Sequence, residues 1–161
     1  MDRGNEPAAT VAFDEGLVLA GGRFGTKEEA IGCLAGLLRD RGYVKDSFLE
    51  AVLAREREYP TGLPTRPVAV AIPHADPGHC IVPCLAVARL IEPVAFGNMG
   101  AESGVVDVSL VFLIGLTAGG DHVSFLGRLA GVFRREDEIE RLMKATSAAE
   151  IERIIRSATG M

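Results

Sequence analysis

Hydrophobic and polar positions repeat with two different periods along this chain, which predicts a mixture of strands and helices. Residues 68–72 alternate valine or isoleucine with alanine, and residues 105–116 form a long apolar run rich in valine. Both patterns are typical of strands covered on both faces, and we expect the second to be the central strand. Residues 16–20 predict a short edge strand, and residues 84–91 and 93–96 predict two further extended segments.

Helical periodicity fills most of the remaining chain. Thr26 with Glu29 forms a capping-box pattern that begins a helix, and Gly42 occupies the place of its C-cap. Ser47, with Glu50 three residues later, predicts the start of a second helix. Further helices are predicted over residues 121–133, 137–144 and 147–156. The whole pattern indicates an α/β fold, with a mixed, partly parallel sheet of about five strands and helices on both faces.

Length and composition favour a single domain. The chain has 161 residues, of which 48% are hydrophobic, and this is enough for one sizeable core. We assign residues 1–12 to a loose N-terminal arm and residues 13–158 to one domain. The formal net charge of -5 comes without a block of basic residues, which disfavours nucleic acid as a partner.

Targeting features and cysteine usage point to the cytoplasm. No apolar stretch approaches the roughly 20 residues of a membrane helix, so no membrane insertion is expected. The N-terminus lacks the basic-then-apolar order of a signal peptide. Cys33, Cys80 and Cys84 match no disulfide framework. His79 with Cys80 and Cys84 fits no standard zinc pattern, and we expect neither a metal nor a cofactor.

Candidate chemistry gathers where the two buried strands end. Pro73 lacks a backbone donor and ends the first strand, which delivers His74 to the rim where open α/β folds bind ligands. His122 follows the long apolar run after a Gly-Gly loop, at a helix N-terminus that favours an anion. Arg55 interrupts the apolar stripe of an earlier helix and needs a partner or a polar cavity at its tip. If the two strands are neighbours, these side chains meet at one edge.

This set of side chains suits phosphoryl transfer. A neutral imidazole nitrogen attacks phosphorus, and a second histidine and an arginine hold the transferring oxygens. The plainer alternatives are a loop histidine that caps or packs at position 74, a snorkelling Arg55 at a helix end, and Arg57 in solvent. No serine-histidine-acid pattern and no phosphate-cradling Gly-Lys loop is present, so hydrolase and nucleotide-kinase functions have no motif behind them.

Three motifs, in order along the chain, connect these residues to a known family. They are Arg55-Glu56-x-x-x-x-Thr61-Gly62, Ala71-Ile72-Pro73-His74 and Asp121-His122-x-x-Phe125-Leu126-x-x-Leu129-Ala130. The set resembles the fructose/mannitol-type enzyme IIA (EIIA) domains of the bacterial sugar phosphotransferase system (PTS), and the resemblance extends over residues 16–155. Residues 59–65, 86–90 and 96–100 look most like the galactitol-specific branch.

The resemblance implies a phosphoryl carrier. By that analogy His74 accepts a phosphoryl group from the phosphocarrier protein HPr and passes it to a cysteine of a cognate enzyme IIB. The membrane enzyme IIC then takes up a sugar alcohol such as galactitol as it is phosphorylated. His122 maps to a second active-site histidine that contacts the group, and Arg55 to the arginine that assists it. Arg57 is a weaker candidate for that role, and Thr61 for support of the loop or ligand.

Two other functions stay open. Relatives of the nitrogen-linked type regulate other proteins through their phosphorylation state. A metal-dependent hydrolase would use His74, His79 and His122, with Asp76 and Asp121 as oxygen ligands. Asp76 also departs from the small residue that the family often has two positions after the histidine, and its simplest interpretation is a turn-capping aspartate.

Overall fold

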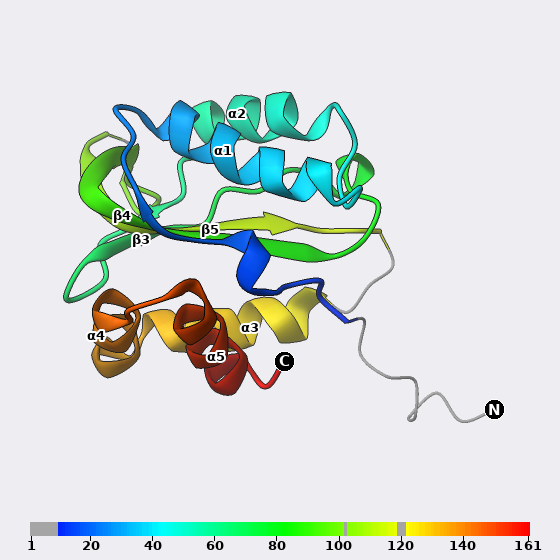
Figure 1. The fold of residues 1–161 in the computed structure, drawn as a ribbon. Helices are drawn as coiled ribbons and strands as arrows, with labels where there is room; N and C mark the ends of the chain where they lie inside the picture. The colour runs from blue at the N-terminus through cyan, green and yellow to red at the C-terminus, as the bar shows by residue number, and fades with distance from the viewer. Residues whose placement is uncertain (1–9, 102, 119–121) are drawn as a thin grey trace.

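The computed structural model describes residues 10–101, 103–118 and 122–161, except for the side chain of His122. In this part of the chain a five-stranded sheet lies between two layers of helices (Figure 1). In spatial order the strands are β1 (Val18–Gly22), β4 (Cys84–Gly97), β5 (Val105–Gly115), β3 (Ala69–Ala71) and β2 (Gly62–Leu63). The pairs β1–β4 and β3–β5 are parallel, and β4–β5 and β2–β3 are antiparallel. The predicted α/β fold with a mixed sheet is confirmed, and the long apolar run is its central strand.

Helices cover both faces of the sheet, as predicted. On one face lie α1 (Lys27–Asp40) and α2 (Phe48–Glu58), and on the other lie α3 (His122–Phe133), α4 (Glu136–Lys144) and α5 (Ala148–Thr159) (Figure 1). Two short 3₁₀ turns are η2 (Glu15–Leu17) and η3 (Pro77–His79). The middle of β5 is buried between the layers, since Leu110, Phe112 and Ile114 are at most 1% exposed. No helix in the described ranges has the length and apolar character needed to cross a bilayer.

Two predicted helix starts and one predicted helix end follow local chemistry. The hydroxyls of Thr26 and Ser147 each accept a hydrogen bond from a backbone N–H three residues later, and Gly42 follows α1 with a left-handed φ of 74°. Ser47 immediately precedes α2, as predicted, but its hydroxyl makes no capping hydrogen bond there. Its backbone is already helical, at φ -76° and ψ -10°, whereas a capping hydroxyl needs the extended conformation. The hydroxyl instead lies 2.8 Å from Nδ1 of His79.

The strand β4 is longer than predicted. Residues 84–91 and 93–96 were expected as separate extended segments, but they form one strand that pairs with β5 along its length. The pairing register shifts between Arg89 and Val94, and Pro93, which has no N–H to donate, sits inside this irregular stretch. At the start of β4, Ala12 is hydrogen-bonded to Pro83 and Leu85. The last residue of the predicted arm therefore lies against the sheet.

The parallel pair β3–β5 positions the candidate chemistry. Ala71 lies opposite Val111, and the pairing continues beyond β3, where the N–H of Ile114 donates to the carbonyl of Pro73 at 3.1 Å. His74 itself forms an isolated bridge with Ile114. The two strands run in the same direction, so their carboxyl ends meet at one edge of the sheet. The two strands are thus neighbours, which is the condition under which the side chains after them can meet at one edge.

Candidate functional site

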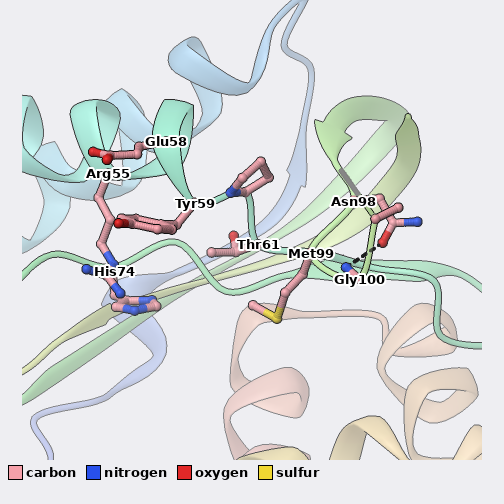
Figure 2. Close-up of a pocket in the computed structure, with 10 residues that line it drawn as sticks. Arg55, Glu58, Tyr59, Thr61, His74, Asn98, Met99 and Gly100 are labelled. Atoms are coloured by element: carbon pink, nitrogen blue, oxygen red, sulfur yellow. Dashed lines mark hydrogen bonds between the residues drawn. The ribbon is translucent and has the colours of Figure 1, made fainter. Parts of the chain in front are cut away.

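A cavity of about 490 Å³ opens beside His74 (Figure 2). Three segments that are far apart in the sequence form it: the end of α2 with the turn after it, the loop after β3, and the turn between β4 and β5. The lining residues are Arg55, Glu58, Tyr59, Pro60, Thr61, His74, Asn98, Met99, Gly100 and Ala101. In the β4–β5 turn the side-chain oxygen of Asn98 accepts the N–H of Gly100 at 2.9 Å, which holds this wall in shape.

The ring of His74 is held in one tautomer by the backbone. Its Nδ1 lies 2.8 Å from the carbonyl oxygen of Ile72. A carbonyl oxygen can only accept, so Nδ1 carries the proton and Nε2 of the neutral ring keeps its lone pair. The flanking Pro73 and Ala75 are buried, and the segment is tied to β5. His74 is therefore a half-buried side chain on rigid support, with a defined nucleophilic nitrogen.

The guanidinium of Arg55 reaches the same cavity from above. Figure 2 shows the side chain running from α2 down to the ring of His74. Its Cζ lies over the ring of Tyr59, at 5.3 Å from the centroid, and Nη1 donates to Oδ1 of Asp76 at 3.3 Å. The Nε atom is buried and has no hydrogen-bond partner among the described residues. Arg55 thus has the partner that its place on an apolar stripe demanded, and it retains unused donors.

The interpretation of Asp76 as a turn-capping residue is wrong. Asp76 stands at the N-cap position of η3, yet its side chain makes no capping hydrogen bond there. Its carboxylate pairs with Arg55, which lies 21 positions earlier in the chain. A long-range ionic partner has replaced the local backbone donor, because the end of α2 passes directly over this loop.

Thr61 lies at the base of the cavity, and its contacts are with Glu56. Its N–H donates to Oε1 of Glu56 at 2.9 Å, and its hydroxyl donates to Oε2 at 2.8 Å. Both residues are buried, with 3% of Thr61 and 2% of Glu56 exposed. Burial raises the pKa of Glu56 and the hydrogen bonds from Thr61 oppose that shift. This contact closes the turn between α2 and β2 and so holds the wall that carries Arg55 and Tyr59.

Sequence reasoning assigned no role to Glu56. The signal was present in the spacing, because an acid at the end of a helix is followed five residues later by a threonine across a Pro turn. The spacing indicates a structural contact only if both residues are buried, and the hydrophobic pattern of α2 did not show that Glu56 is buried. Arg57, the weaker candidate, is exposed and is not part of the cavity wall. Two residues along a helix from Arg55, it faces the other way.

The prediction for His122 concerns a side chain outside the described residues. Its backbone begins α3, the first helix after β5, and Asp121 is likewise outside the described part of the chain. The neighbouring strands β3 and β5 bring the two histidines into one topological region of the sheet. Contact between the two rings stays a prediction.

The third histidine is part of a different cluster. Nδ1 of His79 faces the hydroxyl of Ser47, and His79 is not in the cavity wall. The thiols of Cys80 and Cys84 are buried and hydrogen-bonded to each other, which lowers the pKa of Cys80 and raises that of Cys84. Among the described residues no group of three His, Cys, Asp or Glu could hold a metal ion. The hydrolase alternative therefore has no ligand set in that part of the chain.

The geometry favours attack on an electrophilic phosphorus. The site offers one imidazole lone pair and a guanidinium with unused donors, both at a cavity of about 490 Å³. A guanidinium is suited to hold a phosphoryl group through two parallel hydrogen bonds. Stabilisation of the transferring oxygens is the main task of a phosphoryl-transfer site.

Comparison with known proteins agrees with this chemistry. Residues 12–158 match the family described as "Phosphoenolpyruvate-dependent sugar phosphotransferase system, EIIA 2". The chain is 28% identical over 126 residues to the galactitol-specific EIIA component of the PTS of Escherichia coli strain K12, covering 78% of this chain and 83% of that protein. It is 30% identical over 109 residues to the nitrogen regulatory protein of Pseudomonas aeruginosa, covering 68% of each.

A solved structure shows the same fold. In the complex of the mannitol enzyme IIA with phosphorylated mannitol enzyme IIB from Escherichia coli, the matching chain has a TM-score of 0.75 and 24% sequence identity. The alignment covers 92% of this chain and 99% of that one.

Proposed function

This chain belongs to the EIIA 2 family of the phosphoenolpyruvate-dependent sugar PTS, and from that premise we propose that His74 is the residue that carries its phosphoryl group. Members of this family are phosphotransferase components that carry phosphohistidine. The observation that carries the proposal is the hydrogen bond of 2.8 Å from Nδ1 of His74 to the carbonyl of Ile72, in the same cavity as Arg55. It leaves Nε2 as the nucleophile.

The transfer steps follow from this tautomer. Nε2 of His74 attacks the phosphorus of phosphorylated HPr, the new N–P bond forms, and the bond to the donor histidine breaks. The proton stays on Nδ1, where the Ile72 carbonyl stabilises the positive charge that develops on the ring. In the second step a thiolate of an enzyme IIB attacks the same phosphorus, and the electron pair of the N–P bond returns to Nε2.

Two other residues hold the phosphoryl oxygens in this proposal. Arg55 donates to them from above the ring, with the Tyr59 ring stacked on its guanidinium. His122 supplies a second donor from the start of α3. Thr61 acts at a distance, through its contact with the buried Glu56, and Arg57 contributes only positive charge at the surface.

Labelling tests the site directly. The protein is incubated with labelled phosphoenolpyruvate, enzyme I and HPr, and acid-labile phosphate on the chain is counted. We expect stoichiometric label on wild type and none on His74→Ala, while His79→Ala serves as the matched histidine control and labels normally. Label on His74→Ala at the wild-type level would disprove the site. His122→Ala should accept phosphate but pass it to enzyme IIB slowly.

The sugar alcohol is proposed from similarity. The galactitol-specific relative supports a galactitol-type enzyme IIB as the acceptor and, indirectly, a membrane enzyme IIC. Because phosphoenolpyruvate is a metabolite of the cytoplasm, the proposal also implies that location. Transfer from the phosphorylated chain to purified galactitol and mannitol enzymes IIB decides the matter. Faster transfer to the galactitol enzyme supports this branch, and preference for the mannitol enzyme would reject it.

A regulatory role is the second candidate, because the chain also resembles a nitrogen regulatory protein. A regulator would bind a target in one phosphorylation state and would not pass the group to any enzyme IIB. Parallel capture with wild type, phosphorylated and unphosphorylated, and with His74→Ala separates the two roles. Recovery of a non-transport partner in one state, together with failed transfer to every enzyme IIB tested, would favour regulation.

A further inference from the structure

We propose that Asp76 is a positioning residue, the resting counter-ion of Arg55 that a phosphoryl group on His74 displaces. The inference rests on the proposed function of His74 and goes on to say what sets the readiness of that site to release its group. Asp76 follows His74 by two residues on the same loop. From α2, Arg55 runs to the ring of His74 (Figure 2) and donates a hydrogen bond to Asp76. The guanidinium of Arg55 can therefore pair either with the carboxylate of Asp76 or with a phosphoryl group on His74.

The Arg55–Asp76 ion pair is weak enough for a phosphoryl group to replace Asp76. Its single hydrogen bond is 3.3 Å long, and the side chains are 35% and 82% exposed for Arg55 and Asp76. An ion pair this open to water is weak. Nε of Arg55 is buried without a partner among the described residues, so Asp76 leaves one donor of the guanidinium unsatisfied. A phosphoryl group has three acceptor oxygens and two negative charges, so it competes strongly with a single carboxylate oxygen for this guanidinium.

The cation–π contact of Arg55 with Tyr59 is independent of Asp76. The Cζ atom of Arg55 lies 5.3 Å from the centroid of the Tyr59 ring, and this contact keeps the guanidinium at the site when its ionic partner changes. Asp76 stabilises the empty site through this arginine and not the loaded one. The carboxylate thereby shifts the equilibrium of the carrier toward release of the phosphoryl group.

The experiment measures the equilibrium constant for phosphoryl exchange between HPr and the chain. Asp76→Asn should favour the phosphorylated chain about two- to five-fold, the range expected when a weak exposed ion pair is lost. Asp76→Glu, which keeps the carboxylate, should return toward wild type. The matched control is Glu92→Gln, because Glu92 forms an exposed pair with Arg23 at 3.2 Å that is not part of the cavity wall. This control should leave the constant unchanged.

A double-mutant cycle identifies the route of the effect. If Asp76 acts through Arg55, Asp76→Asn has no effect in an Arg55→Gln background. An effect of full size in that background would mean that Asp76 repels the phosphoryl group directly, and it would overturn the inference. An unchanged constant for Asp76→Asn in the wild-type background would do the same, while label on His74 would leave the proposed function standing.

A second readout needs no phosphoryl transfer. In the unphosphorylated protein, the ¹⁵N–¹H signal of the Arg55 side chain should move on Asp76→Asn and stay in place on Glu92→Gln. An Arg55 signal insensitive to Asp76 would show that the resting pair does not form, whatever the protein carries. Absence of label on wild type would instead reject the proposed function.

Discussion

Two polar contacts that begin at neighbouring residues of α2 differ in almost every physical respect. The contact between Glu56 and Thr61 is buried, with 2% and 3% of the residues exposed. The contact between Arg55 and Asp76 lies at the mouth of the cavity, with 35% and 82% of the side chains exposed. Successive residues of a helix point about 100° apart. Glu56 is therefore directed into the core, while Arg55, the residue before it, is directed toward the cavity.

The two contacts together explain how a site can be rigid and still release the group that it binds. A buried carboxylate with several donors is costly to disturb, because its loss leaves donors without water or partner. An exposed ion pair costs little to break. Glu56 and Thr61 hold the turn that frames the cavity, and Arg55 stays free to exchange one anion for another.

Removing the buried acid should give the largest change in stability. Glu56→Ala leaves the N–H and hydroxyl of Thr61 without their acceptor inside the fold. We expect the free energy of unfolding to fall by about 3 kcal/mol, measured by urea denaturation. Glu58→Ala, at an exposed position of the same helix, is the control and should change it little. Equal losses for the two variants would contradict the assignment of Glu56 as a structural contact.

Removing the exposed cation should instead affect transfer. Arg55→Gln is expected to slow phosphorylation of the chain by HPr about 100-fold, the typical cost of losing one preorganised donor to a transferring oxygen. Stability should change much less than in Glu56→Ala. Rapid-quench measurement of the transfer rate tests this, with Arg57→Gln as the matched control. A slower Arg57→Gln and a normal Arg55→Gln would reverse the assignment of the two arginines.

The pH dependence of stability should expose the buried acid. Burial raises the pKa of Glu56 in the folded state above 4.5, so the native protein binds this proton more tightly than the unfolded chain. The stability from that proton is present below pH 4.5 and is lost as the pH rises through the raised pKa. As the pH rises from 4.5 through the raised pKa of Glu56, the free energy of unfolding of wild type should therefore fall relative to that of Glu56→Gln.

A comparison of variants is needed because other carboxyls act in the opposite direction. The pKa of Asp14 is lowered, chiefly by its hydrogen bond with Arg41, and its contribution to stability is lost as the pH falls. That contribution is common to wild type and Glu56→Gln and cancels in the difference. A difference that is flat with pH would show that Glu56 titrates normally.

Removing the exposed acid should give the smallest change. Asp76→Ala is expected to alter the free energy of unfolding by less than about 0.5 kcal/mol, because the Arg55–Asp76 pair is open to solvent. Urea denaturation at low and at moderate salt checks this. A loss comparable to that of Glu56→Ala would remove the contrast between the two contacts.

The features predicted correctly from sequence were those that depend on nearby residues. Thr26 caps its helix through a backbone N–H only three positions away, and Ser147 caps the last helix in the same way. The demand that Arg55 have a partner also came from local pattern, since a charge on an apolar stripe cannot remain alone. These arguments needed the period of the sequence and nothing beyond it.

The errors came from contacts between distant segments. Asp76 pairs with Arg55 and does not cap its turn. The hydroxyl of Ser47 faces His79, although Ser47 precedes α2 as predicted. Glu56 has a structural role only because the turn after α2 folds back and buries this side chain with Thr61. In each case a polar side chain had two possible partners of similar chemistry, and the packing of other elements decided between them.

The α/β architecture, the family and the delivery of His74 to the end of a buried strand were predictable from the order of the residues, because hydrophobic period and local motifs act over a few positions. Packing of distant segments was needed to place the end of α2 over the His74 loop, to bring Nδ1 of His74 to the Ile72 carbonyl, and to pair Arg55 with Asp76. Those facts depend on how helices pack on a sheet, and a weak local preference yields to that packing.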